Sequence, residues 1–358
     1  MFTSRSTAYT QALLAAALFG ASAPLSKLLL GEMQPIPLAA LLYLGSGAGM
    51  LAYRLFQHRS AQGSALEAGV SRTDMPWLAG AVLAGGVAGP IVLLFSLRVT
   101  PAATASLLLN FEGVATTLIA ALAFKEAIGR RVWGAIGCVT LASILLSWQT
   151  GSEWGMRISV GAVGIVCACV LWGVDNNFTR NVSSKDPTAI VTIKGLAAGS
   201  FSLLLTALLG QPLPGAGAVL GGLLLGTVSY GLSIMLFVHA MRGLGAARTS
   251  ALFGAAPFVG AVLSFVLFRE SLGLVALIAL PLMIVGTALL IGEDHGHPHT
   301  HDQLIHEHRH THEDGHHAHM HESETAVQAG PHSHPHQHIP LIHSHQHLPD
   351  IHHRHGHE

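Results

Sequence analysis

The chain has 358 residues, of which 50% are apolar and only 10% are charged, and its formal net charge is −1. Soluble domains usually carry about 25% charged residues, so this composition excludes an ordinary soluble globular protein, and we expect no nucleic-acid partner. Charge is unevenly distributed: residues 1–291 hold 16 Lys and Arg against 9 Asp and Glu, whereas residues 292–358 hold 2 against 10. The sequence therefore divides into an apolar body and an acidic tail.

Apolar stretches follow one another through the body, each close to the roughly 20 residues that a helix needs to cross a bilayer. Helices satisfy their own backbone groups in lipid, so the sequence predicts an all-α membrane protein with ten transmembrane helices. The predicted spans are residues 8–30, 36–56, 76–97, 101–124, 129–148, 158–179, 187–209, 216–240, 247–268 and 272–291.

The distribution of Lys and Arg indicates the orientation of these spans. Segments on the side of the N-terminus carry eleven of these residues, and segments on the opposite side carry four. Cytoplasmic segments are enriched in Lys and Arg. We therefore expect a multi-pass protein of the plasma (inner) membrane with both termini in the cytoplasm and the lipid bilayer as a partner. A homodimer is left open.

An internal repeat divides the body into two halves, residues 1–148 and 149–291. Residues 101–129 align with residues 245–273 without a gap, at an offset of 144, and the first span aligns with the sixth at an offset of 153. In the second alignment Phe19-Gly20 faces Trp172-Gly173. Each half holds five spans, so the second copy should be inverted in the membrane, an architecture common in secondary transporters.

The repeated motifs resemble the EamA family of the drug/metabolite transporter superfamily. The resemblance rests on the (F/W)-G pair of the first and sixth spans, the x-A-A-x-x-S-x-L stretch, and the F-(K/R)-E that closes the fourth and ninth spans. It covers about residues 8–291 and implies a ten-helix transporter of small organic solutes, often directed outward. The chain departs from the family pattern at residues 109–113, which read Leu-Asn-Phe-Glu-Gly where many relatives are apolar with a proline.

Ionisable residues inside predicted spans are the strongest candidates for a transport site, since each costs about 2.5–3.5 kcal/mol at a helix centre on insertion scales. Glu112 lies in the fourth span, Asp175 in the sixth and Lys194 in the seventh. A carboxylate in apolar surroundings is suited to carry a proton, and Lys194 would be its counter-charge or would bind an anionic group. The alternative is a static ion pair of Lys194 with Glu112 or Asp175 that holds helices together.

Neutral polar residues accompany these charges. Asn110 precedes Glu112, and Asn176 and Asn177 follow Asp175; they would contact the substrate or, alternatively, bridge helices. Phe19 and Trp172 occupy matching repeat positions and would line a cavity or pack in the core. A small and polar stripe on the eighth span would line the cavity or pack against another helix; it consists of Gly222, Gly226, Ser229 or Tyr230, and Ser233.

The tail, residues 292–358, contains 23 of the 25 histidines and no cysteine. Imidazole with some carboxylate suits zinc, nickel, cobalt or copper(II), so we expect a cytoplasmic segment that binds such transition-metal ions and is disordered without them. The body requires no cofactor. The predicted ligands are His295, His297, His299, His301, His306, His308, His310, His312, His316, His317, His319, His321, His332, His334, His336 and His338.

Three functions remain open at this stage. The first, which we favour, is an exporter of a small solute or metabolite that is coupled to protons and carries a metal-binding tail. The second is a transition-metal efflux transporter for nickel, cobalt or zinc, and the third is a membrane-anchored metal store or sensor. No phosphate-binding loop or nucleophile motif is present in the sequence, so we expect neither an ATP-driven pump nor an enzyme.

Overall fold

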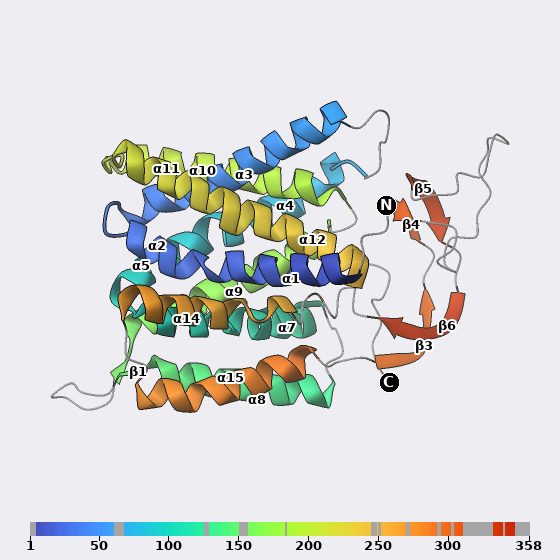
Figure 1. Cartoon of the computed structure of the whole chain (residues 1–358). Helices are drawn as coiled ribbons and strands as arrows, with labels where there is room; N and C mark the ends of the chain where they lie inside the picture. The colour runs from blue at the N-terminus through green and yellow to red at the C-terminus, as the bar shows by residue number, and fades with distance from the viewer. Residues whose placement is uncertain are drawn as a thin grey trace.

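The structure is a computed structural model of a helical bundle. It describes residues 5–60, 68–124, 129–149, 157–182, 185–244, 249, 252–269 and 273–291 of the body, and residues 295–301, 304–310, 332–338 and 341–347 of the tail. In Figure 1 the helices of the body lie side by side along one direction, with the tail strands beyond one end of the bundle. The start of α1 lies at that same end.

The body consists of helices joined by short connections. Two passes are interrupted by π-helical segments, η2 and η3, and one short hairpin joins α8 to α9. The elements are α1 (Arg5–Gly20), α2 (Ser22–Leu29), α3 (Pro35–Ser60), η1 (Arg72–Asp74), α4 (Met75–Ala81), η2 (Val82–Ala88), α5 (Gly89–Val99), α6 (Ala102–Leu108), α7 (Phe111–Phe124), α8 (Arg130–Ser147), β1 (Trp148–Gln149), β2 (Arg157–Ile158), α9 (Val160–Arg180), α10 (Pro187–Leu208), α11 (Ala216–Leu225), η3 (Gly226–Leu232), α12 (Ser233–Leu244), α14 (Ala256–Phe268) and α15 (Leu274–Ile291).

Most of these passes are long enough to cross a bilayer. Eight described helical stretches have at least 18 residues and sufficient hydropathy, and two further apolar helices, Ala256–Phe268 and Leu274–Leu289, are shorter. Large apolar side chains cover the outside of the bundle; Leu122, for example, is 81% exposed and Leu208 74%. Such a surface is stable against lipid rather than water, which makes the chain a multi-pass membrane protein.

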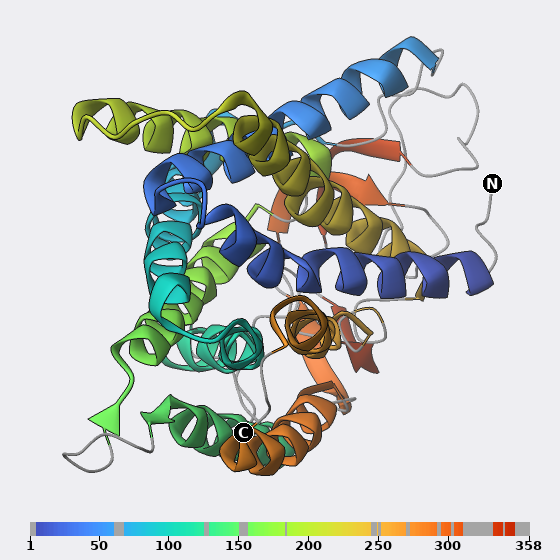
Figure 2. The same cartoon turned by 60° about the vertical axis from the view of Figure 1, so that its left-hand side comes forward.

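Helices of the two halves pack against each other. α3 packs along α10, α8 packs along α15, and α1 packs on α12 and α14. Correspondingly, α9 packs on α4, η2, α5 and α7. Figure 2 shows α8 and α15 as a pair at the edge of the bundle. The central helices α3, α9 and α10 thus bring polar residues of both halves into the interior.

Glycines allow these close crossings. A Cβ on Gly47 would lie 2.5 Å from the Leu196 backbone nitrogen, and a Cβ on Gly195 would lie 2.5 Å from that of Gly47. In the eighth pass, a Cβ on Gly222 would lie 2.9 Å from the Leu41 Cβ, and Gly226 meets the Leu42 carbonyl oxygen. The glycines of the predicted stripe therefore pack against α3. Of the two roles expected for the stripe, the structure shows helix packing at these glycines.

The two π-helical segments occupy matching positions. Residue 82 begins η2 and residue 226 begins η3, and 226 − 82 = 144 is also the offset of the repeated motifs. A π-helical turn carries one extra residue and interrupts the regular ladder of hydrogen bonds, and such turns are frequent at functional sites. Both halves therefore depart from regular helix at the same point of their third pass.

The tail segments form paired strands where we expected disorder. β3 (His295–His301) pairs antiparallel with β6 (Leu341–His347), and β4 (Leu304–His310) pairs with β5 (His332–His338). Histidines at every second residue have the period of a β-strand, which explains this pairing. The register places His297 opposite His345 and His308 opposite His334.

Candidate functional site

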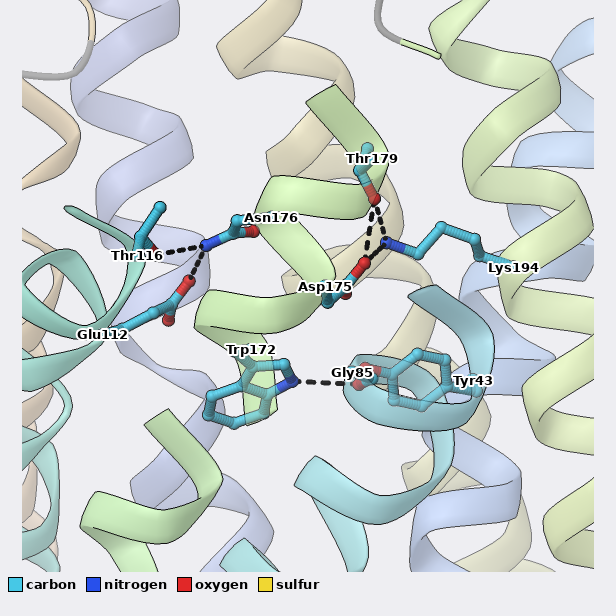
Figure 3. A network of polar contacts seen from close by, with 9 residues as sticks. All are labelled: Tyr43, Gly85, Glu112, Thr116, Trp172, Asp175, Asn176, Thr179 and Lys194. Atoms are coloured by element: carbon cyan, nitrogen blue, oxygen red, sulfur yellow. Dashed lines mark hydrogen bonds and ion pairs between the residues drawn. The ribbon is translucent and has the colours of Figure 1, made fainter. Parts of the chain in front are cut away.

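The candidate site surrounds α9 in the interior of the bundle. Gly173 lets α7 approach this helix closely, because a Cβ there would lie only 2.9 Å from the Thr116 backbone nitrogen. On the other side of α9, η2 approaches at Gly85, where a Cβ would overlap the Asp175 side chain. Polar side chains of α9 therefore reach both neighbouring passes (Figure 3).

Glu112 belongs to the first of two polar groups. The Asn176 side-chain nitrogen donates to Glu112 Oε1 at 2.9 Å and to Thr116 Oγ1 at 3.1 Å. Asn176 is exposed and Glu112 partly exposed, although α9 is packed against passes of both halves. The described residues therefore do not enclose this polar group completely.

The second group is a buried ion pair. Lys194 Nζ lies 2.5 Å from Asp175 Oδ1, with side chains that are 18% and 9% exposed. The Thr179 hydroxyl donates to the same oxygen at 2.8 Å, and Lys194 Nζ donates to Thr179 Oγ1 at 3.0 Å. Of the two ion pairs considered from the sequence, the structure contains Asp175–Lys194, and this pair connects α9 to α10 past η2.

Two aromatic side chains bind the π-helical segment below these groups. Trp172 Nε1 donates to the Gly85 carbonyl oxygen at 2.9 Å, and the Tyr43 hydroxyl donates to the same oxygen at 2.6 Å. Irregular turns leave carbonyl groups without helical partners, and a buried carbonyl needs a donor. Trp172 and Tyr43 therefore fix η2 against α9 and α3 (Figure 3).

A cluster of rings continues from Tyr43 across the interior. The Tyr43 and Tyr230 ring centroids are 5.8 Å apart, and those of Tyr230 and Phe19 are 5.9 Å apart. Phe19 then contacts Phe253 at 5.3 Å. Phe19 and Trp172, which occupy matching repeat positions, thus contact η3 and η2 respectively.

Other predicted residues lie outside this site or bridge helices. Asn110 faces α15, accepting from Thr287 Oγ1 at 3.3 Å, and does not contact Glu112 or Asp175. Asn177 donates to the backbone oxygens of Thr116 at 3.0 Å and Gly173 at 2.8 Å, so it joins α7 to α9.

The side chains of the predicted tail ligands lie outside the part of the chain that the structure describes. His312, His316, His317, His319 and His321 lie outside the described residues, and the others lie in strands described by their backbone alone. Among the side chains that the structure does describe, no three His, Cys, Asp or Glu residues form a group that could hold a metal ion.

Sequence reasoning missed three members of the site. Thr116 follows Glu112 by four residues and Thr179 follows Asp175 by four, a spacing that places side chains on the same helix face. Helical spacing could therefore have found both threonines. Tyr43 lies in an apolar span, and only the tertiary structure shows that α3 packs on η3 and that the Tyr43 hydroxyl reaches Gly85 of η2.

Comparison with known proteins identifies the class and the family. The fold and the interior polar network define a multi-pass membrane protein. The profile of the EamA-like transporter family matches residues 6–148 and again residues 159–292. The chain belongs to this family, which is part of the drug/metabolite transporter superfamily, and is a membrane transporter of small solutes.

The chain is also similar to individual proteins, among them one curated protein and one solved structure. An uncharacterized transporter of Methanothermobacter thermautotrophicus (strain Delta H) is 27% identical over 296 residues, which cover 79% of this chain and 85% of that protein. A solved crystal structure shares 21% identity with a TM-score of 0.57, covering 80% of this chain and 96% of the other. The second likeness concerns the fold alone.

Proposed function

We propose that the protein is a proton-coupled secondary transporter that exports a small solute or metabolite through a pathway beside α9. The observation that carries the proposal is the polar network of Glu112, Asn176, Asp175 and Lys194 in the interior of an otherwise apolar bundle. Charged residues in such a position are costly, and in membrane proteins they mark transport pathways and proton relays.

Inverted repeats with five helices each would supply the alternating access that a secondary transporter needs. Three observations support this architecture. The family profile matches the chain twice, and the first residues of η2 and η3 are 144 positions apart, which is the offset of the repeated motifs. In addition, α1 packs on η3 and α12 as α9 packs on η2 and α5. The network lies where the halves meet, between α7 and α9 on one side and α9 and α10 on the other.

Glu112 is the proposed coupling residue. Asp175 is neutralised by Lys194 in a short ion pair, whereas Glu112 accepts a hydrogen bond from a neutral amide. Adding a proton to Glu112 would remove an uncompensated charge from the interior, and releasing it would restore that charge. A carboxylate of this kind can link proton binding to a change between two states of the bundle.

The tail would bind zinc, nickel, cobalt or copper(II) in the cytoplasm and would gather or sense these ions. Support comes from its 23 histidines and from a strand register that places histidines opposite one another. Opposed residues in an antiparallel pair have Cβ atoms about 4.5–5.5 Å apart, which suits two imidazoles sharing one ion. This composition also keeps transition-metal efflux as a second candidate function.

The experiment that tests proton coupling is a flux measurement in proteoliposomes. Glu112→Gln keeps the shape of the side chain but cannot exchange a proton, so we expect proton-driven flux to be abolished with normal expression and membrane insertion. Glu32→Gln removes the same charge from an exposed position between α2 and α3 and should leave flux unchanged. Normal flux in Glu112→Gln would exclude Glu112 from coupling.

A comparison of the full chain with a chain that ends at Ile291 separates the solute exporter from the metal exporter. Both proteins are tested for host resistance to metals and for vesicle flux of metals and metabolites. If only metal resistance and metal flux depend on the tail, the metal exporter is favoured. If solute flux persists without the tail, the tail is an accessory to a solute transporter.

A further inference from the structure

The polar network carries an excess negative charge. Asp175 and Lys194 cancel each other in an ion pair, and each is further satisfied by Thr179. The described residues provide no cationic side chain as an ion-pair partner for Glu112, so the three charged groups Glu112, Asp175 and Lys194 sum to −1. An unpaired charge in surroundings of low polarity is unfavourable, so the site attracts one positive charge.

The groups around Glu112 suit an ammonium cation. One carboxylate oxygen already accepts from Asn176, and an ammonium with several N–H donors can use the remaining acceptor positions. The Asn176 side-chain nitrogen is occupied by Glu112 and Thr116, which directs its carbonyl oxygen to other donors. Because Asn176 is exposed, a ligand can reach this side of α9.

Aromatic residues lie on the same part of the interior. Trp172 precedes Asn176 by four residues, on the same face of α9. Trp172 and Tyr43 donate to the same Gly85 carbonyl oxygen, and the Tyr230 ring contacts those of Tyr43 and Phe19. Aromatic faces attract cations and also bind the apolar part of an organic amine.

We propose that the transported solute is an organic monocation with an ammonium group, which binds the Glu112 carboxylate beside Asn176, with its apolar part against the aromatic cluster that includes Trp172 and Tyr230. This inference rests on the proposed transport function and adds the substrate class. An ammonium group and a proton would neutralise the same carboxylate, so binding of one displaces the other. Such exclusion is the requirement for exchange of an outward-moving amine against an inward-moving proton.

The test uses three probes of the same shape and different charge on the purified full chain. Benzylammonium, benzyl alcohol and benzoate share an aromatic ring and differ in the group attached to it. Calorimetry at neutral pH should show binding of benzylammonium, weaker binding of benzyl alcohol and no binding of benzoate. Equal binding of the alcohol, preferred binding of benzoate, or absence of benzylammonium binding at millimolar concentrations would each overturn the proposal.

Variants locate the charge that recognises the ammonium. Glu112→Gln should weaken benzylammonium binding by about tenfold or more, with little change for benzyl alcohol. Glu112→Asp retains the charge and should retain the preference for benzylammonium over benzyl alcohol, which covers the case in which Glu112→Gln does not fold. Glu32→Gln is the matched control and should bind as the unaltered chain does. Loss of preference in Glu112→Asp, or an unchanged affinity in Glu112→Gln, contradicts the assignment.

The outcomes separate the substrate class from the proposed function. If Glu112→Gln loses proton-driven flux but benzylammonium and benzyl alcohol bind equally, proton-coupled transport stands and the ammonium site is wrong. If benzylammonium binds through Glu112 while flux shows no dependence on a proton gradient, the site stands and the coupling is wrong.

Discussion

At the scale of single residues, the Asp175–Lys194 ion pair is buried in the interior, so its two charges depend on each other. Removing one partner leaves an uncompensated buried charge, which destabilises a protein by about 3–5 kcal/mol. We therefore expect Asp175→Asn and Lys194→Met each to lower the free energy of unfolding by that order. The double variant should lower the free energy of unfolding by less than the sum of the two single effects, because it leaves no unpaired charge. Denaturant unfolding in detergent micelles measures all three.

The matched control for these variants is the ion pair between Arg54 and Asp186. It has a distance of 3.5 Å, and the side chains are 39% and 17% exposed. Exposed pairs contribute about 0–1 kcal/mol, so Arg54→Met should change stability little. A double variant of Asp175 and Lys194 as destabilised as the sum of its singles would show that the two side chains act independently.

Sequence spacing left the partner of Lys194 open for a physical reason. Asp175 lies five residues before the end of α9 and Lys194 lies seven residues after the start of α10, so both have a similar depth from the connection. The depth of a residue along its helix follows from the sequence, but the lateral distance between residues of different helices does not. The position of Glu112 relative to Lys194 depends on where α7 packs, and the structure places Glu112 against Asn176 instead.

At the scale of elements, the approach of η2 to α9 depends on Gly85. An added Cβ would overlap the Asp175 carboxylate and its Cβ, so Gly85→Ala must displace Asp175 or η2. Overpacking of this kind costs about 1–3 kcal/mol. We expect Gly85→Ala to lower the thermal unfolding temperature in detergent and to reduce solute flux in proteoliposomes.

Gly137→Ala is the control for this substitution. Gly137 lies within α8, and no atom lies within 4 Å of the Cβ that alanine would add there. Alanine favours helix by up to about 1 kcal/mol relative to glycine, so this variant should be as stable as the unaltered chain or more stable. Normal flux and stability in Gly85→Ala would show that η2 does not pack on Asp175 as described.

The helices themselves were largely predictable, and their irregularities were not. Long apolar stretches predicted the eight described helical stretches that are long enough to cross a membrane, whereas the last two predicted spans correspond to shorter apolar helices. The two π-helical segments have no distinctive amino-acid composition in common: η2 reads VLAGGVA and η3 reads GTVSYGL. They depend on tertiary partners such as Tyr43 and Trp172, which supply donors to a carbonyl that regular helix would have satisfied.

At the scale of the whole molecule, both halves match the family profile, but their charged residues differ. At the repeat offset of 153, the position of Asp175 corresponds to residue 22, which is a buried serine. The second half provides the ion pair and the first half provides Glu112, while aromatic rings come from both halves. A central site with charged groups beside aromatic rings is suited to a solute with one charged and one apolar end.

The proposed metal binding by the tail would give the whole molecule a pH-dependent property. Metal ions bind neutral imidazole, and an unperturbed histidine has a pKa of about 6.5. Protons therefore displace the metal as the pH falls through this value, and the stabilisation that binding provides is present above it. We expect zinc or nickel affinity of the full chain to fall steeply between about pH 7 and about pH 5.5.

Calorimetric titration of the purified full chain with each metal measures this dependence. The control is the chain that ends at Ile291, which lacks 23 of the 25 histidines and should bind neither metal with comparable affinity. Because the body and tail are connected near the end of α15, solute flux with and without zinc then shows whether metal occupancy of the tail acts on transport. Metal affinity that stays constant across this pH range, or equal affinity in the truncated chain, would exclude the histidines as the ligands.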